Sequence, residues 1–202
     1  MRRHASLLAI IVVTVIAQTG TLHGAGSTIS GAVKIMGLAS NADAVVYIQE
    51  AQGTFPATKP VEMDQRGNKF IPHVLPVVVG TTVRFLNGDP TAHNVFSPDY
   101  EKYDLGNWSQ GANKEYAFKE CAQAPCVYSQ LCKIHPQMDA YVTVLQNPYF
   151  AVTDKDGRFT IADVPPGSYT IGVWYPRRYK APPQPVTVDG GAPATVDFVL
   201  AR

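Results

Sequence analysis

The sequence is poor in the residue types that usually carry chemistry. Its 202 residues include only three cysteines, five histidines and four methionines. Charged residues are also few and almost balanced, with 17 Lys and Arg against 16 Asp and Glu. A chain so close to neutrality has no electrostatic reason to bind nucleic acid or an anionic membrane, and we expect neither partner.

Long apolar runs are missing except for one near the N-terminus. That run, residues 5–17, follows two arginines and precedes several small residues. It is shorter than the roughly 20 apolar residues that a membrane-spanning helix needs, and its flanks are typical of a secretory signal peptide. We therefore interpret residues 1–25 as a signal peptide. The mature protein is expected to be periplasmic or secreted, without a membrane span.

A helical apolar period is also absent outside the signal. Short β-branched and aromatic runs occur instead, separated by Gly, Pro, Asn and Asp. These runs are STISGAVKI, DAVVYIQ, VLPVVVGTTVRFLN, CVYSQLC, AYVTVLQ, RFTIADV, SYTIGVWY, PVTVDG and ATVDFVLA. Their spacing is typical of antiparallel β-sandwiches or barrels, so the expected fold class is all-β.

The three cysteines divide into a pair and a single residue. Cys121 and Cys126 enclose only AQAP, and in an oxidising compartment so close a pair is most simply a disulfide. Cys132 then has no covalent partner. Because an unpaired thiol outside the cytoplasm is a liability unless it is buried or bound, Cys132 is the first candidate for a ligand.

Cys132 opens the stretch LCKIHPQM, in which His135 and Met138 follow at intervals of three residues. A short loop between two predicted strands brings these three side chains toward a common point. His93, after a Gly-Asp-Pro turn, is the candidate for a fourth ligand from outside the loop. His73 stands beside a long apolar run with no ligand-type residue nearby, and we interpret it as a partly exposed residue at the start of a strand.

Two imidazoles, one thiolate and a weak axial thioether form the ligand set of blue copper electron-transfer sites. Structural zinc is the main rival ion, but it normally takes four strong Cys or His ligands. A nucleophilic Cys–His pair is the other rival, and it leaves Met138 without a task. We do not expect an enzyme, because only the oxidation state of the copper would change. A multicopper oxidase or a nitrite reductase would need further His-rich copper sites, and only His73 remains.

The stretches NGDPTAHNVFSPD and LCKIHPQM resemble the cupredoxin family, and the C-x2-H-x2-M spacing with proline after the histidine is similar to that of amicyanin-like members. The resemblance covers about residues 60–146. It implies a Greek-key β-sandwich that holds one type 1 copper ion and exchanges electrons with redox protein partners. It also implies copper ligands and two neighbouring asparagines. The implied ligands are His93, Cys132, His135 and Met138. Asn94 is implied to hydrogen-bond near the Cys132 sulfur, and Asn87 to tie its loop to the ligand loop.

A second resemblance covers the C-terminal part. TDKDGRFTIADVPPGSYTIGVWY, with a hairpin turn expected at Asp156-Gly157, resembles the carboxypeptidase regulatory-like, transthyretin-like β-sandwich, which is usually a structural or interaction module. Residues 148–202 are few for an independent domain, so they need partner strands. Residues 27–53 are the best source, which makes residues 54–147 an inserted copper domain. The alternative is that the early strands belong to the middle domain.

Two other segments receive plain interpretations. PDYEKYDLGNW, residues 98–108, is acidic and aromatic, and we expect loop packing there. RRYK, residues 177–180, is expected to be a solvated loop, although it could meet an acidic partner.

The sequence thus predicts an exported type 1 copper protein that carries single electrons between redox partners. Two alternatives stay open. One is a periplasmic protein that binds copper for trafficking, and the other is a structural or adhesion module with a vestigial copper site.

Overall fold

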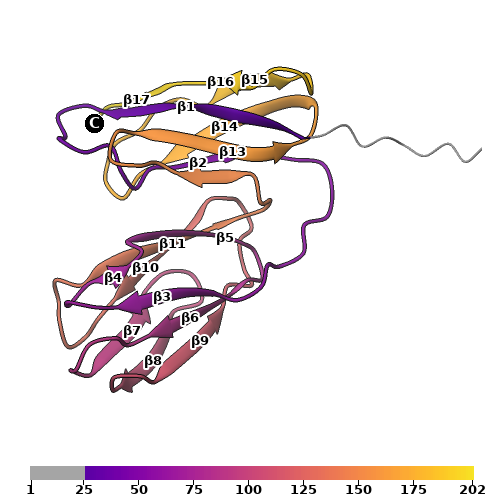
Figure 1. Ribbon diagram of the computed structural model, residues 1–202. Coiled ribbons are helices and arrows are strands. Elements are labelled where there is room, and N and C mark those ends of the chain that lie inside the picture. The colour runs from indigo at the N-terminus through magenta and orange to yellow at the C-terminus, as the bar shows by residue number, and fades with distance from the viewer. Residues whose placement is uncertain (1–25) are drawn as a thin grey trace, which may run out of the picture.

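The computed structural model describes residues 26–202, and the predicted signal peptide lies outside them. All seventeen regular elements in that range are β-strands, which confirms the all-β fold class. The strands form two sandwiches, one above the other in Figure 1. Among residues 26–202 there is no helix of the length and apolarity that crossing a membrane requires.

The upper sandwich in Figure 1 is built from both ends of the described chain, and we call it the split sandwich. Its first sheet contains β1 (Ser27–Ile35), β13 (Arg158–Val164), β16 (Ala194–Thr195) and β17 (Phe198–Leu200). Its second sheet contains β12 (Phe150–Val152), β2 (Val45–Ile48), β14 (Gly167–Trp174) and β15 (Gln184–Val188). Thus β1 and β2 pair with strands that follow residue 148.

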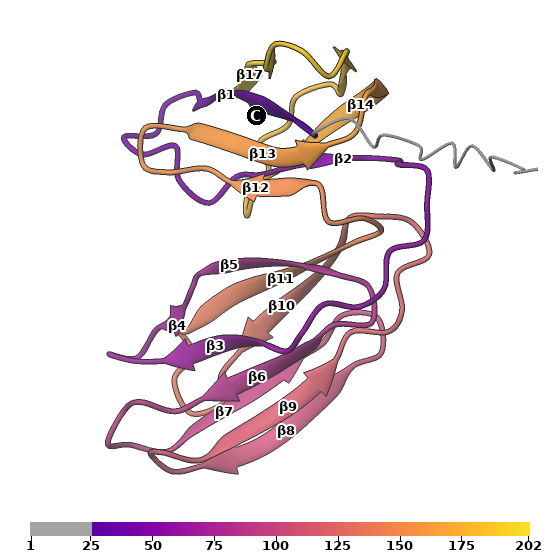
Figure 2. The same ribbon diagram turned by 45° about the vertical axis from the view of Figure 1, so that its right-hand side comes forward.

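The lower sandwich contains the intervening strands, and we call it the inserted sandwich. Its larger sheet has the order β5 (Val74–Val78), β11 (Asp139–Leu145), β10 (Cys126–Leu131), β7 (His93–Ser97) and β8 (Tyr103–Trp108). Its other sheet has the order β4 (Phe70–Ile71), β3 (Val61–Gln65), β6 (Thr82–Leu86) and β9 (Asn113–Ala117). Figure 2 shows these two sheets facing each other.

Each sandwich has its own apolar core, as two face-to-face sheets require. Ile29, Ile48 and Phe198 are fully buried or nearly so in the split sandwich. Phe85 and Tyr128 are fully buried in the inserted sandwich. The alternating burial of β10, whose side chains turn inward at every second residue, also directs the residue after the strand, Cys132, into this core.

A third apolar cluster joins the two sandwiches. Val45 and Tyr47 of β2 pack with Val74 of β5 and Leu145 of β11, and all four side chains are buried. Trp174 at the end of β14 meets Tyr141 of β11 edge to face, with ring centroids 5.4 Å apart. The junction therefore has the buried apolar character of a packed interface, not of a bare linker.

Two expectations from the sequence require correction. Gly157 does make a tight turn, with φ of 85°, and a Cβ there would lie 2.1 Å from the Val33 carbonyl oxygen. The flanking strands, however, belong to different sheets, so the turn connects sheets and is not a hairpin. The segment 98–108 was expected to be loop, but Tyr103–Trp108 forms β8, an edge strand that pairs with β7.

Candidate metal centre

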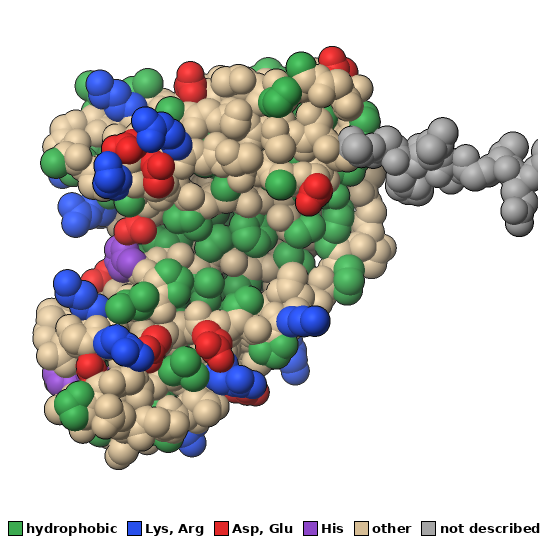
Figure 3. Space-filling model, viewed as in Figure 1, with side chains coloured by type: hydrophobic (Ala, Val, Ile, Leu, Met, Phe, Trp, Pro, Cys, Tyr) green, Lys and Arg blue, Asp and Glu red, His purple; other side chains and the backbone are tan. Residues whose placement is uncertain are grey.

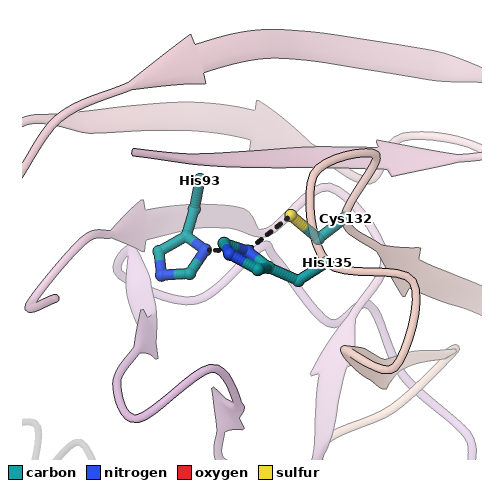
Figure 4. A group of neighbouring side chains, drawn as sticks. All are labelled: His93, Cys132 and His135. Carbon is teal, nitrogen blue, oxygen red and sulfur yellow. Dashed lines mark hydrogen bonds between the residues drawn. The ribbon is translucent and has the colours of Figure 1, made fainter. Parts of the chain in front are cut away.

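Three of the four expected ligands meet in the inserted sandwich. The Nδ1 atoms of His93 and His135 lie 3.1 Å apart, and the His135 Nδ1 lies 3.8 Å from the Cys132 Sγ. Taking one ligand atom from each residue, the three atoms lie within 4.8 Å of one another. Figure 4 shows the two rings and the sulfur converging. His93 and Cys132 are buried and His135 is half-buried, so His135 is the most exposed of these three candidate ligands.

The strands bring these residues together from distant parts of the sequence. His93 is the first residue of β7, and Cys132 directly follows β10. These two strands are antiparallel neighbours, with Leu131 opposite Phe96. The β10–β11 connection then turns back tightly, because the Met138 N–H donates to the His135 carbonyl at 2.9 Å. One tight loop and one adjacent strand are therefore enough to assemble the group.

The donor set and its spacing fit one copper ion. Nitrogen–metal bonds of about 2 Å place two imidazole nitrogens on one ion roughly 3 Å apart, close to the separation of the two Nδ1 atoms here. Cys132 is a free, buried cysteine, so its sulfur is available as a ligand. Imidazole and thiolate together suit copper.

Asp89 is a residue of this site that the sequence reasoning missed. Its carboxylate accepts a hydrogen bond from the His93 Nε2–H at 2.8 Å, which leaves the His93 Nδ1 lone pair free to face His135. Asp89 is itself held by the backbone N–H groups of Gly67 and Asn68, at 2.7 and 3.0 Å. The Asn68 N–H chiefly, with help from Gly67 and His93, lowers the pKa of Asp89 to about 2, against the effect of burial. The carboxylate is therefore ionised and fixed.

Asn94 contacts the cysteine through its backbone. Its N–H points to the Cys132 Sγ at 3.5 Å, while its side-chain nitrogen donates to Asp104 and to the Gly106 carbonyl. The Asn94 side-chain oxygen accepts from the Lys133 N–H at 3.3 Å. The side chain thus ties β8 to the loop after Cys132, and the main chain supplies the donor to sulfur.

Asn87 organises the other half of the site. Its side chain donates to the carbonyls of Thr91 and Trp108 and accepts from the Asp89 N–H at 2.9 Å. These bonds fix the turn before His93 and join it to β8. The hydrogen bonds of the side chain run to this turn and to β8, not to the loop between Cys132 and Met138.

Met138 and the cysteine pair complete the expected set. Met138 is 1% exposed and packs in the same core cluster as Cys132, and its axial role stays a prediction. Cys121 and Cys126 form a disulfide that closes the loop before β10.

His73 lies outside the metal group. It is partly exposed, as expected, but it has a partner that the sequence did not indicate. Its Nδ1 contacts the Asp43 carboxylate of the split sandwich at 2.8 Å, and its Nε2 lies 3.6 Å from Asp139. His73 therefore belongs to the junction between the sandwiches.

Comparison with known proteins gives one family match. Residues 135–201 match the family model of the carboxypeptidase regulatory-like domain, which confirms that resemblance. The match begins inside the β10–β11 loop and not at residue 148, so the exact limits of the domains stay predictions. A comparison with curated proteins found no match to the chain.

Solved structures similar to the chain contain copper domains. A Cu-containing nitrite reductase (NirK) from Thermus scotoductus SA-01 is 30% identical over 42% of this chain, with a TM-score of 0.38. The chain spans only 22% of that reductase. A purple cupredoxin from Nitrosopumilus maritimus is 26% identical, over 42% of this chain and 98% of its own, with a TM-score of 0.37.

An amicyanin in its reduced Cu(I) form at pH 4 is 23% identical, over 48% of this chain and 86% of its own, with a TM-score of 0.38. Each likeness covers less than half of the chain, and scores this low do not assign a function to it. Part of the chain is similar to solved cupredoxins, and residues 135–201 match a carboxypeptidase regulatory-like domain.

Proposed function

We propose that this chain is an exported type 1 copper protein that carries single electrons between redox partners. His93, Cys132 and His135 would hold one copper ion, and Met138 would be a further, weaker ligand. The convergence of the two Nδ1 atoms and one thiol sulfur within 4.8 Å carries the proposal. The export part rests on the signal-like residues 1–25 and on the disulfide, which suits an oxidising compartment.

The surroundings of the site favour electron transfer over chemistry on a substrate. Copper bound to imidazole and thiolate supplies one-electron oxidation and reduction. The buried Asp89 and the backbone of Asn94 hold the ligand atoms in place, which keeps the geometry similar in both oxidation states. His135 is the only one of the three clustered ligands that is not fully buried, and it is the proposed exit for the electron.

The test is the absorption spectrum and the electron paramagnetic resonance spectrum of the mature protein with one equivalent of Cu(II). A thiolate–copper site gives an intense blue or green charge-transfer band and a narrow copper hyperfine splitting. Cys132→Ser removes the band, whereas His73→Ala, a substitution at a histidine of the junction, leaves it unchanged. A colourless complex with ordinary splitting would contradict electron transfer and favour copper trafficking.

Zinc is tested in the same preparation. Competition between Cu(I) and Zn²⁺ distinguishes the two ions, because a thioether and a single thiolate suit copper better than zinc. Stronger binding of Zn²⁺ than of either copper ion would overturn the choice of metal.

A further inference from the structure

A group of unpaired cations lies on the split sandwich. Arg177, Arg178 and Lys180 stand in the connection between β14 and β15, and Arg202 lies beside them because the backbones of Lys180 and Ala201 hydrogen-bond to each other. We call these four residues the basic cluster. All four are exposed, and among residues 26–202 none of them forms an ion pair.

The cluster has a defined shape. The three arginines and Tyr179 line one shallow pocket, and the Arg202 guanidinium lies over the Tyr179 ring at 5.3 Å. Two carboxylates near this end, Asp43 and Asp139, contact His73 and not the basic cluster. The cluster therefore presents concentrated positive charge on a chain that is nearly neutral overall.

The cluster lies at the same end of the molecule as the ligand loop. Its connection leaves the sheet at Trp174, whose ring meets Tyr141, and Tyr141 follows Met138 by only three residues. Burial and then the Asp139 carboxylate raise the pKa of Tyr141, and the nearby positive charge of Arg177 opposes this shift. Figure 1 shows the β10–β11 and β14–β15 connections at its left-hand side. Figure 3 shows Lys and Arg side chains there, with Asp and Glu side chains among them, above a hollow between the sandwiches.

We propose that the basic cluster is the electrostatic half of a docking surface for an acidic redox protein. The other half is the surface around His135, where Ile134 is 42% exposed. Because the cluster lies at the end that carries the proposed electron exit, a negatively charged partner held there faces the copper loop. Complementary charge of this kind raises association rates and orients partners more than it adds affinity. The inference rests on the proposed function.

The test uses two forms of one redox protein. Native cytochrome c is basic, and succinylation converts its lysines to carboxylates, so the two forms present opposite charge around the same haem. Stopped-flow absorbance measures the second-order rate of electron exchange with the copper-loaded protein. The rate with the succinylated form is expected to be the higher one at low salt and to fall as salt is added, since screening shortens the range of the charges.

Two double variants locate the effect. R177Q/R178Q removes two charges from the basic cluster. K59Q/K119Q removes two exposed charges from the opposite end of the inserted sandwich, close to Thr81 and the disulfide. The first variant is expected to slow the reaction with succinylated cytochrome c about tenfold at low salt, and the second to leave it unchanged. Equal effects of the two variants would overturn the proposal.

Failure of the docking surface is distinguishable from failure of the copper site. Isothermal titration calorimetry of the metal-free protein with succinylated cytochrome c measures docking without any electron transfer. Binding that R177Q/R178Q weakens supports the surface even where copper gives no colour. Binding of the chain to phosphatidylglycerol vesicles, lost in R177Q/R178Q while both cytochrome rates stay unchanged, would assign the cluster to a membrane and overturn the proposal.

Discussion

At the scale of single residues, the proposed metal site depends on the Asp89 carboxylate, which hydrogen-bonds to the candidate ligand His93. Asp89 is 8% exposed and His93 is fully buried, so the pair is shielded from water. A carboxylate on the remote nitrogen of a ligand histidine fixes the tautomer and makes the imidazole a stronger donor. Asp89 is thus a positioning residue.

Asp89→Asn tests this role. The amide keeps the volume but loses the negative charge, and its NH2 group would face the backbone N–H groups of Gly67 or Asn68 or the imidazole. We expect the affinity for copper to fall about 10- to 100-fold, as is usual for such partners of metal ligands. Titration against a copper chelator measures the affinity, and electron paramagnetic resonance reports the accompanying change in geometry.

Asp189→Asn is the matched control, because Asp189 is exposed in a turn of the split sandwich. The two variants binding copper equally tightly would show that Asp89 has no positioning role.

The sequence predicted the three clustered residues, but it did not predict Asp89, which holds His93 in place. Cys132 and His135 are recognisable because a thiol and an imidazole at close spacing in a short loop are rare and chemically specific. Asp89 has no such signature, since aspartate in a Gly-Asp-Pro turn is ordinary turn chemistry. Its role became visible only when the fold brought Asn68 and His93 to the same carboxylate.

At the scale of elements, the predictable strands were those with apolar residues on at least one face. β2, whose four residues are all buried, was evident from VVYI, and β11 from AYVTVLQ. β9 was not found, because NKEYA has no fully buried residue and gives no alternating apolar signal. β8, at the edge of the other sheet, was missed because Trp108 is the only buried residue among its six and no alternating apolar signal results. Edge strands of this kind owe their structure to pairing with a neighbour.

The disulfide restrains the start of β10, the strand that leads to the copper cysteine. Cys121 and Cys126 are five residues apart, so the bond closes a small loop. The double substitution C121A/C126A is expected to lower the free energy of unfolding by about 2 kcal/mol, the chain-entropy effect of a loop of this size. Urea denaturation of the metal-free protein measures the change.

The colour of the copper complex is expected to stay in C121A/C126A, because Cys132 stands at the opposite end of β10. Loss of the charge-transfer band in this variant would mean that the cysteine pair, and not Cys132 alone, serves the metal.

At the scale of the whole molecule, the junction between the sandwiches contains a pH-sensitive contact. The hydrogen bond to Asp43 chiefly, with the charge of Asp139 adding to it, raises the pKa of His73 above its ordinary value of 6.5. Protonated His73 therefore stabilises the folded chain. This contribution is complete below the ordinary pKa and is lost as the pH rises through the higher folded pKa.

The free energy of unfolding of the metal-free protein is expected to decrease between pH 6 and pH 8 by less than about 1 kcal/mol from this source, since the pair is partly exposed. His73→Gln removes that part of the pH dependence. Thermal or urea unfolding across the pH range, compared between the two proteins, measures it. The same slope in both proteins would rule out His73 as the group responsible.

The order of the strands along the chain also affects the order in which the two sandwiches can fold. Within residues 26–202, β1 pairs with β13, β16 and β17, all of which follow the inserted sandwich in the sequence. When the chain is synthesised, or passes through a translocation channel, β1 emerges early. It stays unpaired until its partner strands follow. The loop with Cys132 and His135 is complete before any of these neighbours has appeared. Metal capture can therefore precede closure of the split sandwich, and a chain interrupted shortly after residue 147 keeps the ligands while leaving β1 an unpaired edge.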